Sequence, residues 1–340
     1  MHVPDGFFTL PVSVSAGVVA AAGVAVCLRA TRRELDDRTA PMAGLVAAFV
    51  FAVQMLNFPV AAGTSGHLLG GALAAVLVGP YTAVLCMAVV LLVQGLAFAD
   101  GGLSALGVNI TLMGIVTAAV GWGVFLLVKR LFGGGRGAVV AGASAGALVS
   151  VPVSALVFTL LFWIGGNAPI EVGTVAAAMG GVHVLIGIGE ALITAVTVST
   201  VLAVRPDLVY GARGLTGALV LRGPDGETTE AAQETRPMTR PGRPGRFLLS
   251  GIVLAALLAG VASFFASASP DGLERVAEDA GFISSATDHP LGGQPLADYG
   301  EAGGIPVGIA GLVGVGVTAV VGGGLFYAVG RRRVRAYARD

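Results

Sequence analysis

Charged residues are scarce in this chain, and so are cysteines. Asp, Glu, Lys and Arg make up 12% of the 340 residues, about half the share found in an ordinary soluble protein. This composition excludes a soluble globular domain, and we expect no nucleic-acid partner. The two cysteines, Cys27 and Cys86, lie in apolar segments and are expected to be buried thiols, so they say nothing about the redox compartment.

Two common sequence signals are also missing. Residues 1–10 contain no Lys or Arg ahead of the first apolar run, so the positively charged start of a cleavable signal peptide is absent. We therefore expect the run from Val12 to Leu28 to be a retained membrane-spanning helix. The glycines at 133–135 are not followed by the Lys and Ser or Thr of a phosphate-binding loop, which excludes nucleotide binding there.

Apolar residues, in contrast, are abundant. They make up 55% of the chain, the mean hydropathy is +0.86, and the 53 glycines suit close packing of helices in lipid. A helix needs about 20 apolar residues to cross the hydrocarbon core of a bilayer. The sequence therefore predicts an all-α integral membrane protein with spans at 12–28, 42–58, 67–79, 81–98, 108–128, 138–164, 175–204, 247–268 and 305–330.

The basic residues are distributed unevenly between the loops. If the predicted spans alternate in direction, nineteen of the twenty Lys and Arg residues fall on one side of the membrane, and only Arg275 falls on the other. The positive-inside rule then places the N-terminus outside. The outer loops are acidic, which raises the local concentration of cations, although the ordinary solubility of exposed loops would by itself account for these acids.

Three regions follow from this pattern. Residues 1–205 are predicted to form a seven-helix transmembrane bundle. Residues 206–246 are polar and rich in Pro and Gly, which indicates a cytoplasmic linker that is mostly extended. Residues 247–340 are predicted to form a two-helix transmembrane hairpin with an outside loop at 269–304.

The first two residues offer three nitrogen ligands in succession. These are the α-amine of Met1, the backbone amide of His2 and the imidazole of His2. If the amide loses its proton, the three nitrogens close two small chelate rings around one cation and lie nearly in a plane. Tetragonal nitrogen sites favour Ni(II) and Cu(II), and Co(II) can also occupy them. The alternative is that these residues simply start the chain and bind nothing.

His67 is a second candidate ligand. It follows Gly63-Thr64-Ser65-Gly66, just after the second predicted span emerges outside, and it opens an apolar stretch of 13 residues. As a helix this stretch reaches about 20 Å, short of a hydrocarbon core of about 30 Å. We therefore expect His67 in a recess below the outer surface, within reach of the folded-back amino terminus. The alternative is a histidine that only caps a helix.

Other polar residues are candidates for supporting this pocket. His183 and Glu190 lie on one face of the seventh predicted span, and ionisable groups inside a membrane are costly and usually functional. They are expected to pair with each other, to steady the pocket, or to form a structural hydrogen bond between helices. Gln54 and Asn57 end the second span near the recess. His289, in the outside loop, is expected to be a solvated surface histidine.

Three motifs stand out in residues 1–205. They are Met1-His2-Val3-Pro4-Asp5-Gly6-Phe7, then Asn57-Phe58-Pro59-Val60 with Gly63-Thr64-Ser65-Gly66-His67-Leu68-Leu69-Gly70-Gly71-Ala72-Leu73, and then Asp100-Gly101-Gly102-Leu103-Ser104-Ala105-Leu106-Gly107-Val108-Asn109. Together they resemble the CbiM/NikM family, the substrate-capture (S) components of energy-coupling factor transporters for cobalt and nickel. Downstream, the segment Pro270-Asp271-Gly272-Leu273-Glu274, with Gly281-Phe282 and Pro295-Leu296-Ala297-Asp298-Tyr299-Gly300, resembles the PDGLE domain, an accessory component of the same transporters.

The resemblance implies a square-planar site of four nitrogens, supplied by the Met1 amine, the His2 amide, the His2 imidazole and His67. It implies Co2+ or Ni2+ as the transported substrate, and no residue decides between the two metals. The implied partners are a transmembrane coupling (T) subunit and two cytoplasmic ATPase subunits, in a multi-pass protein of the bacterial cell membrane surrounded by lipid. Residues expected to support the ligands without binding the metal are Gln54, Asn57, Ser65, Asn109, His183 and Glu190.

The chain departs from the family pattern at one point. Asn109 is followed by Ile110-Thr111-Leu112-Met113-Gly114, where the resemblance leads us to expect a second Asn. We expect this difference to alter hydrogen bonding around the site without removing a ligand. The outside loop at 269–304, the accessory loop, holds several acids, one histidine and no cysteine. We therefore expect the accessory loop to assist loading or opening of the pocket and not to store a second metal.

Two other classes of function are alternatives. A membrane metal receptor or sensor without transport is the alternative, and cytoplasmic signalling domains, which would support it, are absent from the sequence. An intramembrane metalloenzyme would need a ligand pair such as H-E-x-x-H with a base, which His183 and Glu190 do not form. The chain is therefore not expected to be an enzyme.

Overall fold

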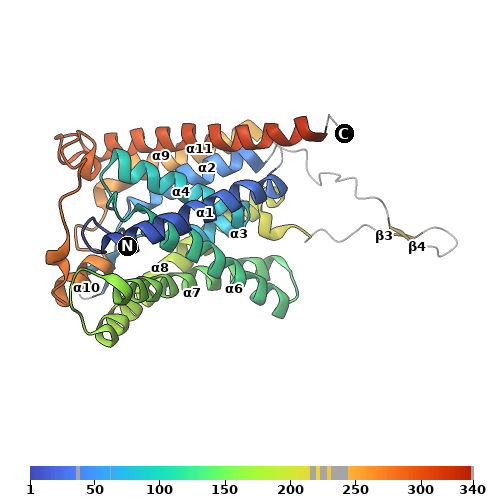
Figure 1. The fold of residues 1–340 in the computed structure, drawn as a ribbon. Coiled ribbons are helices and arrows are strands. Elements are labelled where there is room, and N and C mark those ends of the chain that lie inside the picture. The colour runs from blue at the N-terminus through green and yellow to red at the C-terminus, as the bar shows by residue number, and fades with distance from the viewer. Residues whose placement is uncertain (36–38, 62, 215–219, 223–227, 231–243, 338–340) are drawn as a thin grey trace.

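The computed structural model describes residues 1–35, 39–61, 63–214, 220–222, 228–230 and 244–337. Figure 1 shows long helices with roughly parallel axes, with the N-terminus and α10 at one end of the bundle and the last turns of α11 at the other. The linker expected at 206–246 falls largely outside the described residues. Its described parts include turns at Pro206–Leu208 and Tyr210–Ala212 and a pair of antiparallel strands, β3 (Val220–Arg222) and β4 (Thr228–Glu230).

The first part of the chain is built from helices joined by short connections. Their bounds are α1 (Leu10–Glu34), α2 (Thr39–Gln54), α3 (Gly71–Val78), α4 (Pro80–Ala97), α5 (Leu106–Asn109), a π-helical segment (Ile110–Val116) that continues into α6 (Thr117–Leu131), α7 (Arg136–Gly165) and α8 (Val172–Val204). A short hairpin of β1 (Phe58–Ala61) and β2 (Thr64–Gly66) lies between α2 and α3.

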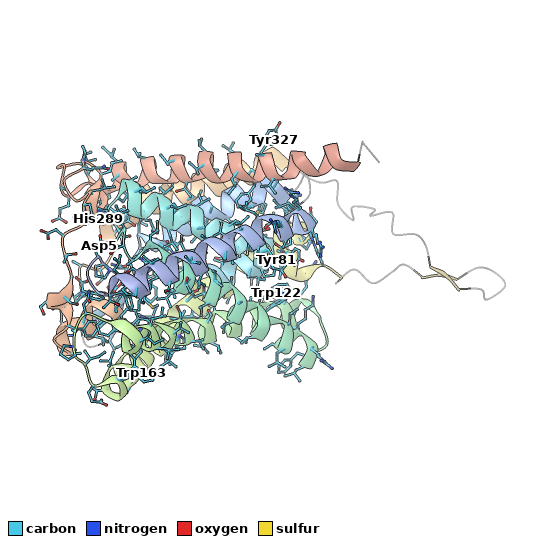
Figure 2. All side chains as sticks on the ribbon, in the orientation of Figure 1. Asp5, Tyr81, Trp122, Trp163, His289 and Tyr327 are labelled. Atoms are coloured by element: carbon cyan, nitrogen blue, oxygen red, sulfur yellow. The ribbon has the colours of Figure 1, made fainter. Side chains whose placement is uncertain are left out.

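The all-α membrane architecture expected from composition is confirmed. Seven helices of the described chain are long and apolar enough to span a bilayer, and α2, with 16 residues, is shorter. Helices are favoured in lipid because every backbone polar group is then satisfied within its own segment. Large apolar side chains cover the outside of the bundle, including Leu127, Trp163, Leu192 and Val196, and Figure 2 shows Trp163 on that outer surface. The chain is a multi-pass membrane protein.

The span predicted at 67–79 differs most from the structure. Only Gly71–Val78 is helical, so α3 rises about 12 Å, and the chain from His67 to Gly70 is non-helical. Gly70 has a φ of 88°, a conformation that only glycine adopts readily, and this turn separates His67 from the helix. Every residue of α3 is buried, so α3 is a core element and not a lipid-facing span.

The C-terminal part forms the expected hairpin and packs on the bundle through α2. Its elements are α9 (Pro244–Gly260), a turn at Ala262–Phe265, α10 (Gly272–Asp279), turns at Ile283–Ser285 and Ala297–Gly300, and α11 (Val307–Tyr337). Glycines make the contact close: a Cβ at Gly44 of α2 would stand 2.9 Å from the Cα of Gly323 in α11. Small residues at such crossings let helix backbones approach in lipid.

Two buried apolar clusters organise the interior. The larger is centred on α2, α3 and α4. The smaller gathers the N-terminal segment, α7 and the accessory loop, where the ring of Phe282 packs 5.4 Å from Phe7 and 4.9 Å from Phe162, measured between centroids. The accessory loop is thereby fixed over the end of the bundle that holds the N-terminus.

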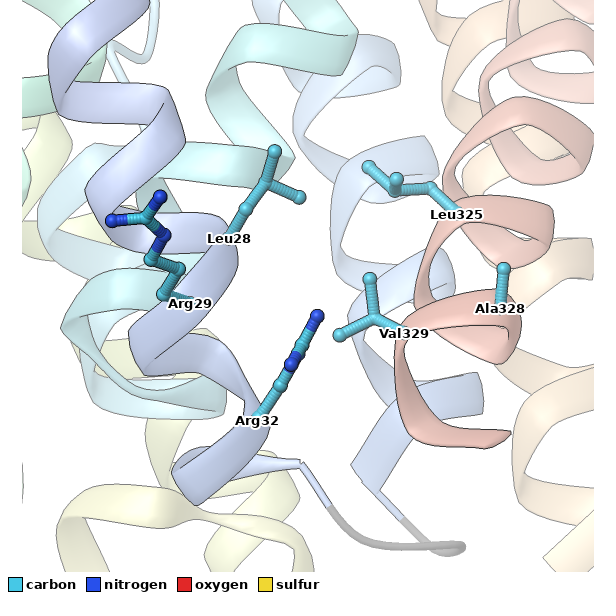
Figure 3. A pocket seen from close by; sticks show the side chains of 6 residues that line it. All are labelled: Leu28, Arg29, Arg32, Leu325, Ala328 and Val329. Carbon is cyan, nitrogen blue, oxygen red and sulfur yellow. The ribbon is translucent and has the colours of Figure 1, made fainter. Parts of the chain in front are cut away.

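A groove of about 270 Å³ opens between α1 and α11. Leu28, Leu325 and Val329 supply apolar walls, and Arg29 and Arg32 project from α1 beside it (Figure 3). These residues lie near the C-terminal ends of both helices, at the opposite end of α1 from Met1. The groove is therefore separate from the pocket around the N-terminus.

Candidate metal centre

The N-terminal segment folds into the end of the bundle and is held there by its backbone. The amide of Val3 donates to Oδ1 of Asn109 at 2.8 Å, and the carbonyl of Val3 accepts from Nδ2 of Asn109 at 3.1 Å and from the amide of Gly102 at 2.8 Å. The carboxylate of Asp5 accepts from the backbone amides of Leu103 and Ser104. As a result Met1 is only 2% exposed.

His67 presents one nitrogen to the Met1 amine. Since a carbonyl only accepts, Nδ1 of His67 donates to the carbonyl oxygen of Leu68 at 3.0 Å, and Nε2 is left to face the pocket. That Nε2 contacts the amine of Met1 directly. Metal-binding histidines typically donate their other ring nitrogen to a backbone carbonyl or a carboxylate in this way, so His67 is oriented as a ligand.

The loop behind His67 is held by a buried carboxylate. Glu190 of α8 is fully buried and accepts from the amides of Leu69, at 2.7 Å, and Gly70, at 3.1 Å. The side chain of Gln54 donates to the carbonyl of Leu69 at 2.9 Å. Glu190 and Gln54 therefore fix the backbone that carries His67, and Glu190 does not pair with His183.

His2 lies beside His67 in the same pocket. The two rings stack with centroids 4.9 Å apart and planes 15° from parallel. Nδ1 of His2 is 3.2 Å from Oδ1 of Asp100, and Nε2 is 3.2 Å from Oε1 of Gln94. Burial lowers the pKa of His2 to about 4, against the opposing charge of Asp100, so the ring is neutral near pH 7 and able to act as a ligand once Nδ1 leaves Asp100.

Sequence reasoning missed a second layer of contacts from the accessory loop. Asp271 accepts from the Met1 amine at 2.6 Å and lies 3.6 Å from Nε2 of His67. The spacing Asp271-x-x-Glu274 is typical of the capping box that starts α10, but no local sequence pattern indicates a contact between Asp271 and Met1.

A second residue of the accessory loop reaches the partners of His2. The hydroxyl of Tyr299 donates to Asp100 at 2.5 Å and receives a hydrogen bond from Gln94 at 3.2 Å.

The charge of the Met1 amine changes the pKa of its neighbour Asp271. Burial raises the pKa of the Asp271 carboxyl, but the positive charge of the Met1 amine, together with contacts from His67, outweighs burial and holds the pKa of Asp271 well below its usual range. Asp271 is therefore ionised at neutral pH and places a negative charge beside two of the candidate ligands.

The remaining predicted residues take other positions. The hydroxyl of Ser65 donates to the carbonyl of Ser269 at 2.7 Å, and the backbone carbonyl of Asn57 accepts from the amide of Ser267 at 2.8 Å. Ser65 and Asn57 therefore anchor the chain at Ser267 and Ser269, where the accessory loop begins.

His183 does not reach the candidate ligands through a hydrogen bond. It donates from Nδ1 to the carbonyl of Met179 at 2.8 Å, and its buried Nε2 has no hydrogen-bond partner among the described residues.

The residues present fit a cation bound mainly by nitrogen. In the part of the chain that the structure describes, no three His, Cys, Asp or Glu side chains are grouped closely enough to hold a metal by themselves. A cation here would therefore need backbone nitrogen, which the Met1 amine and the His2 amide can supply. No described residue accepts a hydrogen bond from that amide, so its proton can leave without breaking one.

The chain is similar to known cobalt and nickel transport proteins. Residues 2–208 match the family described as the cobalt uptake substrate-specific transmembrane region, CbiM, and residues 245–331 match the PDGLE domain. The fused nickel transport protein NikMN of Rhodobacter capsulatus is 34% identical over 224 residues, covering 62% of this chain and 64% of that protein. The cobalt transport protein CbiM of Sorangium cellulosum is 35% identical over 215 residues, covering 62% of this chain and 94% of that protein.

A solved structure is also similar. The crystal structure of a truncated transition metal transporter is 27% identical in sequence, with a TM-score of 0.54, and the match covers 60% of this chain and 99% of that one.

Proposed function

Because this chain belongs to the CbiM family of cobalt uptake transmembrane proteins and continues into a PDGLE domain, we propose that it is the substrate-capture component of an energy-coupling factor importer for a divalent transition metal. The cargo is Co2+ or Ni2+, bound in a plane by the Met1 amine, the His2 amide, the His2 imidazole and Nε2 of His67. All four are nitrogen ligands, which suit both metals.

One observation carries this proposal. The amine of Met1 and Nε2 of His67 are in contact, with the His2 ring stacked alongside, although 66 residues separate Met1 from His67. The side chains of Met1, His2 and His67 are between 1% and 9% exposed. Buried polar groups need partners, and a cation that replaced the present hydrogen bonds would satisfy all of them together.

The chain itself is a transporter component and not an enzyme, as its family indicates. We propose that transport energy comes from two cytoplasmic ATPase subunits through a transmembrane coupling subunit, since the sequence has no phosphate-binding loop. Metal uptake by vesicles containing the protein, with and without these partners, tests the assignment. Tight binding with no uptake in either case would instead identify a receptor.

The chelate is tested by blocking the amine. One residue added before Met1 turns the amine into an amide and should abolish tight binding of Co2+, measured by titration of the purified protein. A matching residue added after Asp340 controls for the change in length and should bind as the native chain does. Equal affinity of the N-terminally extended and native proteins would rule out the chelate.

A further inference from the structure

Carboxylates are the outermost groups of the pocket. The side chains of Asp100 and Asp271 are 22% and 17% exposed, whereas those of Met1 and His67 are 1% and 5% exposed. A cation arriving from solvent therefore meets a carboxyl group before it meets the nitrogens. Negative charge at the mouth of a cleft also raises the local concentration of cations.

The two oxygens of Asp271 have different tasks. Oδ1 accepts from the amides of Leu273, at 2.8 Å, and Glu274, at 2.9 Å, and so caps α10. Oδ2 takes no part in the cap and points into the pocket, 2.6 Å from the Met1 amine and 3.6 Å from Nε2 of His67. One oxygen thus fixes the side chain while the other stays available to a ligand.

The backbone around Asp271 is fixed relative to His67. The amide of Ser65 donates to the carbonyl of Pro270 at 2.9 Å, and Ser65 pairs with Asp271 as a parallel bridge at the edge of β2. Phe282, after α10, is fully buried against Phe7. The position of Oδ2 beside two ligand nitrogens is therefore set by several contacts and not by one flexible side chain.

We propose that Oδ2 of Asp271 is the first ligand of the incoming cation and transfers it to the Met1 amine and His67. This inference rests on the proposed function, and it makes the accessory domain a contributor of a metal-binding atom. Hard oxygen ligands suit borderline metals less well than nitrogen does, so the contact is transient. As nitrogen replaces oxygen, the protons of the Met1 ammonium and the His2 amide pass to water.

The test measures the rate of metal loading. The full chain in lipid nanodiscs is mixed with Co2+ alone in a stopped-flow instrument, and the absorbance of bound metal is followed. A transient oxygen complex makes the observed rate of the native protein level off as Co2+ rises. Asp271→Asn should load about tenfold more slowly, with a rate that stays linear in Co2+ and with nearly unchanged final occupancy.

Matched variants separate a ligand from a general charge. Glu274→Gln removes the same charge three residues away and should load as the native protein does. Asn and Ser both cap helices well, so Asp271→Ser is a second variant that keeps α10 intact. Native loading kinetics in both Asp271 variants, equal slowing in Glu274→Gln, or loss of equilibrium binding in Asp271→Asn would each overturn the proposal. Failure of the native protein to bind Co2+ would instead refute the proposed function.

Discussion

His67 is a proposed ligand whose ring is oriented by a local contact, because its Nδ1 lies 3.0 Å from the carbonyl oxygen of the next residue, Leu68. His67→Ala removes the fourth nitrogen and lets water into the pocket, so we expect a changed d–d absorption spectrum of bound Co2+ and loss of uptake. His289→Ala is the control, and its absorption spectrum and metal uptake should remain near those of the native protein. His289 is half-buried and accepts from the amide of Leu291, unlike the solvated residue expected from sequence, but it lies outside the chelate. Normal transport by His67→Ala would refute the proposal that His67 is a metal ligand.

Glu190 acts on the site through the backbone. Glu190→Gln keeps the shape but leaves one acceptor oxygen for two buried amides, and an unsatisfied buried donor costs about 1–3 kcal/mol. We expect Co2+ affinity to fall about tenfold, since 1.4 kcal/mol corresponds to that factor, with a shifted d–d spectrum. Glu171→Gln, at an exposed position before the same helix, should bind as the native protein does. An unchanged spectrum in Glu190→Gln would show that Glu190 does not position His67.

Parts of the candidate site that lie in short sequence motifs could be predicted, and contacts between distant segments could not. Met1 and His2 are adjacent, and His67 lies in a distinctive motif, so chemistry and resemblance were enough to predict that the three lie in one pocket. Asn109 and Glu190 were predicted only as supporting residues, and their partners could not be named. Asp271 was missed as a contact of Met1 because 270 residues separate them, and only packing of the accessory loop brings them together.

At the scale of elements, long apolar helices were predictable and short buried ones were not. Spans such as α7 and α8 satisfy the length and hydropathy that a bilayer requires. The stretch at 67–79 is as apolar as these spans, so composition did not distinguish it from them. In the structure, however, Gly70 turns the chain, and α3 is short enough to be enclosed by other helices. The π-helical segment at 110–116 also carries no composition signal, since it differs from an α-helix only in its hydrogen bonds.

The loop before α5 must approach the N-terminal segment closely, which requires glycine at position 102. A Cβ there would stand 2.6 Å from the carbonyl carbon of Pro4 and overlap the backbone of Asp5. Gly102→Ala should therefore displace the N-terminal segment and weaken Co2+ binding at least tenfold, with helical content by circular dichroism unchanged. Gly181→Ala, on α8 with open space around it, should have neither effect. Native affinity in Gly102→Ala would mean that the segment is not held by this contact.

At the scale of the whole molecule, the accessory hairpin is joined to the bundle by contacts at α2 and over the pocket. Ending the chain at residue 245 removes Asp271, Tyr299 and Phe282 together. We expect the uptake rate to fall strongly while one metal still binds per chain, because the proposed nitrogens all precede residue 205. Metal content and initial uptake rate of the two forms check this. A retained rate, or a fall from two bound metals to one, would contradict the division of roles.

Carrying the accessory loop on the same chain as the pocket has a kinetic consequence. Two segments joined covalently meet at an effective concentration that reaches about the millimolar range. A loop that binds its site with a dissociation constant near 1 mM then covers it about half of the time. With ordinary association rates of about 10⁵–10⁷ M⁻¹s⁻¹, such a loop leaves the site about 10²–10⁴ times per second. Because the loop and the pocket belong to one chain, the loop can cover the pocket for about half of each transport cycle and still leave it quickly. Two separate proteins would reach this combination only at high concentrations in the membrane.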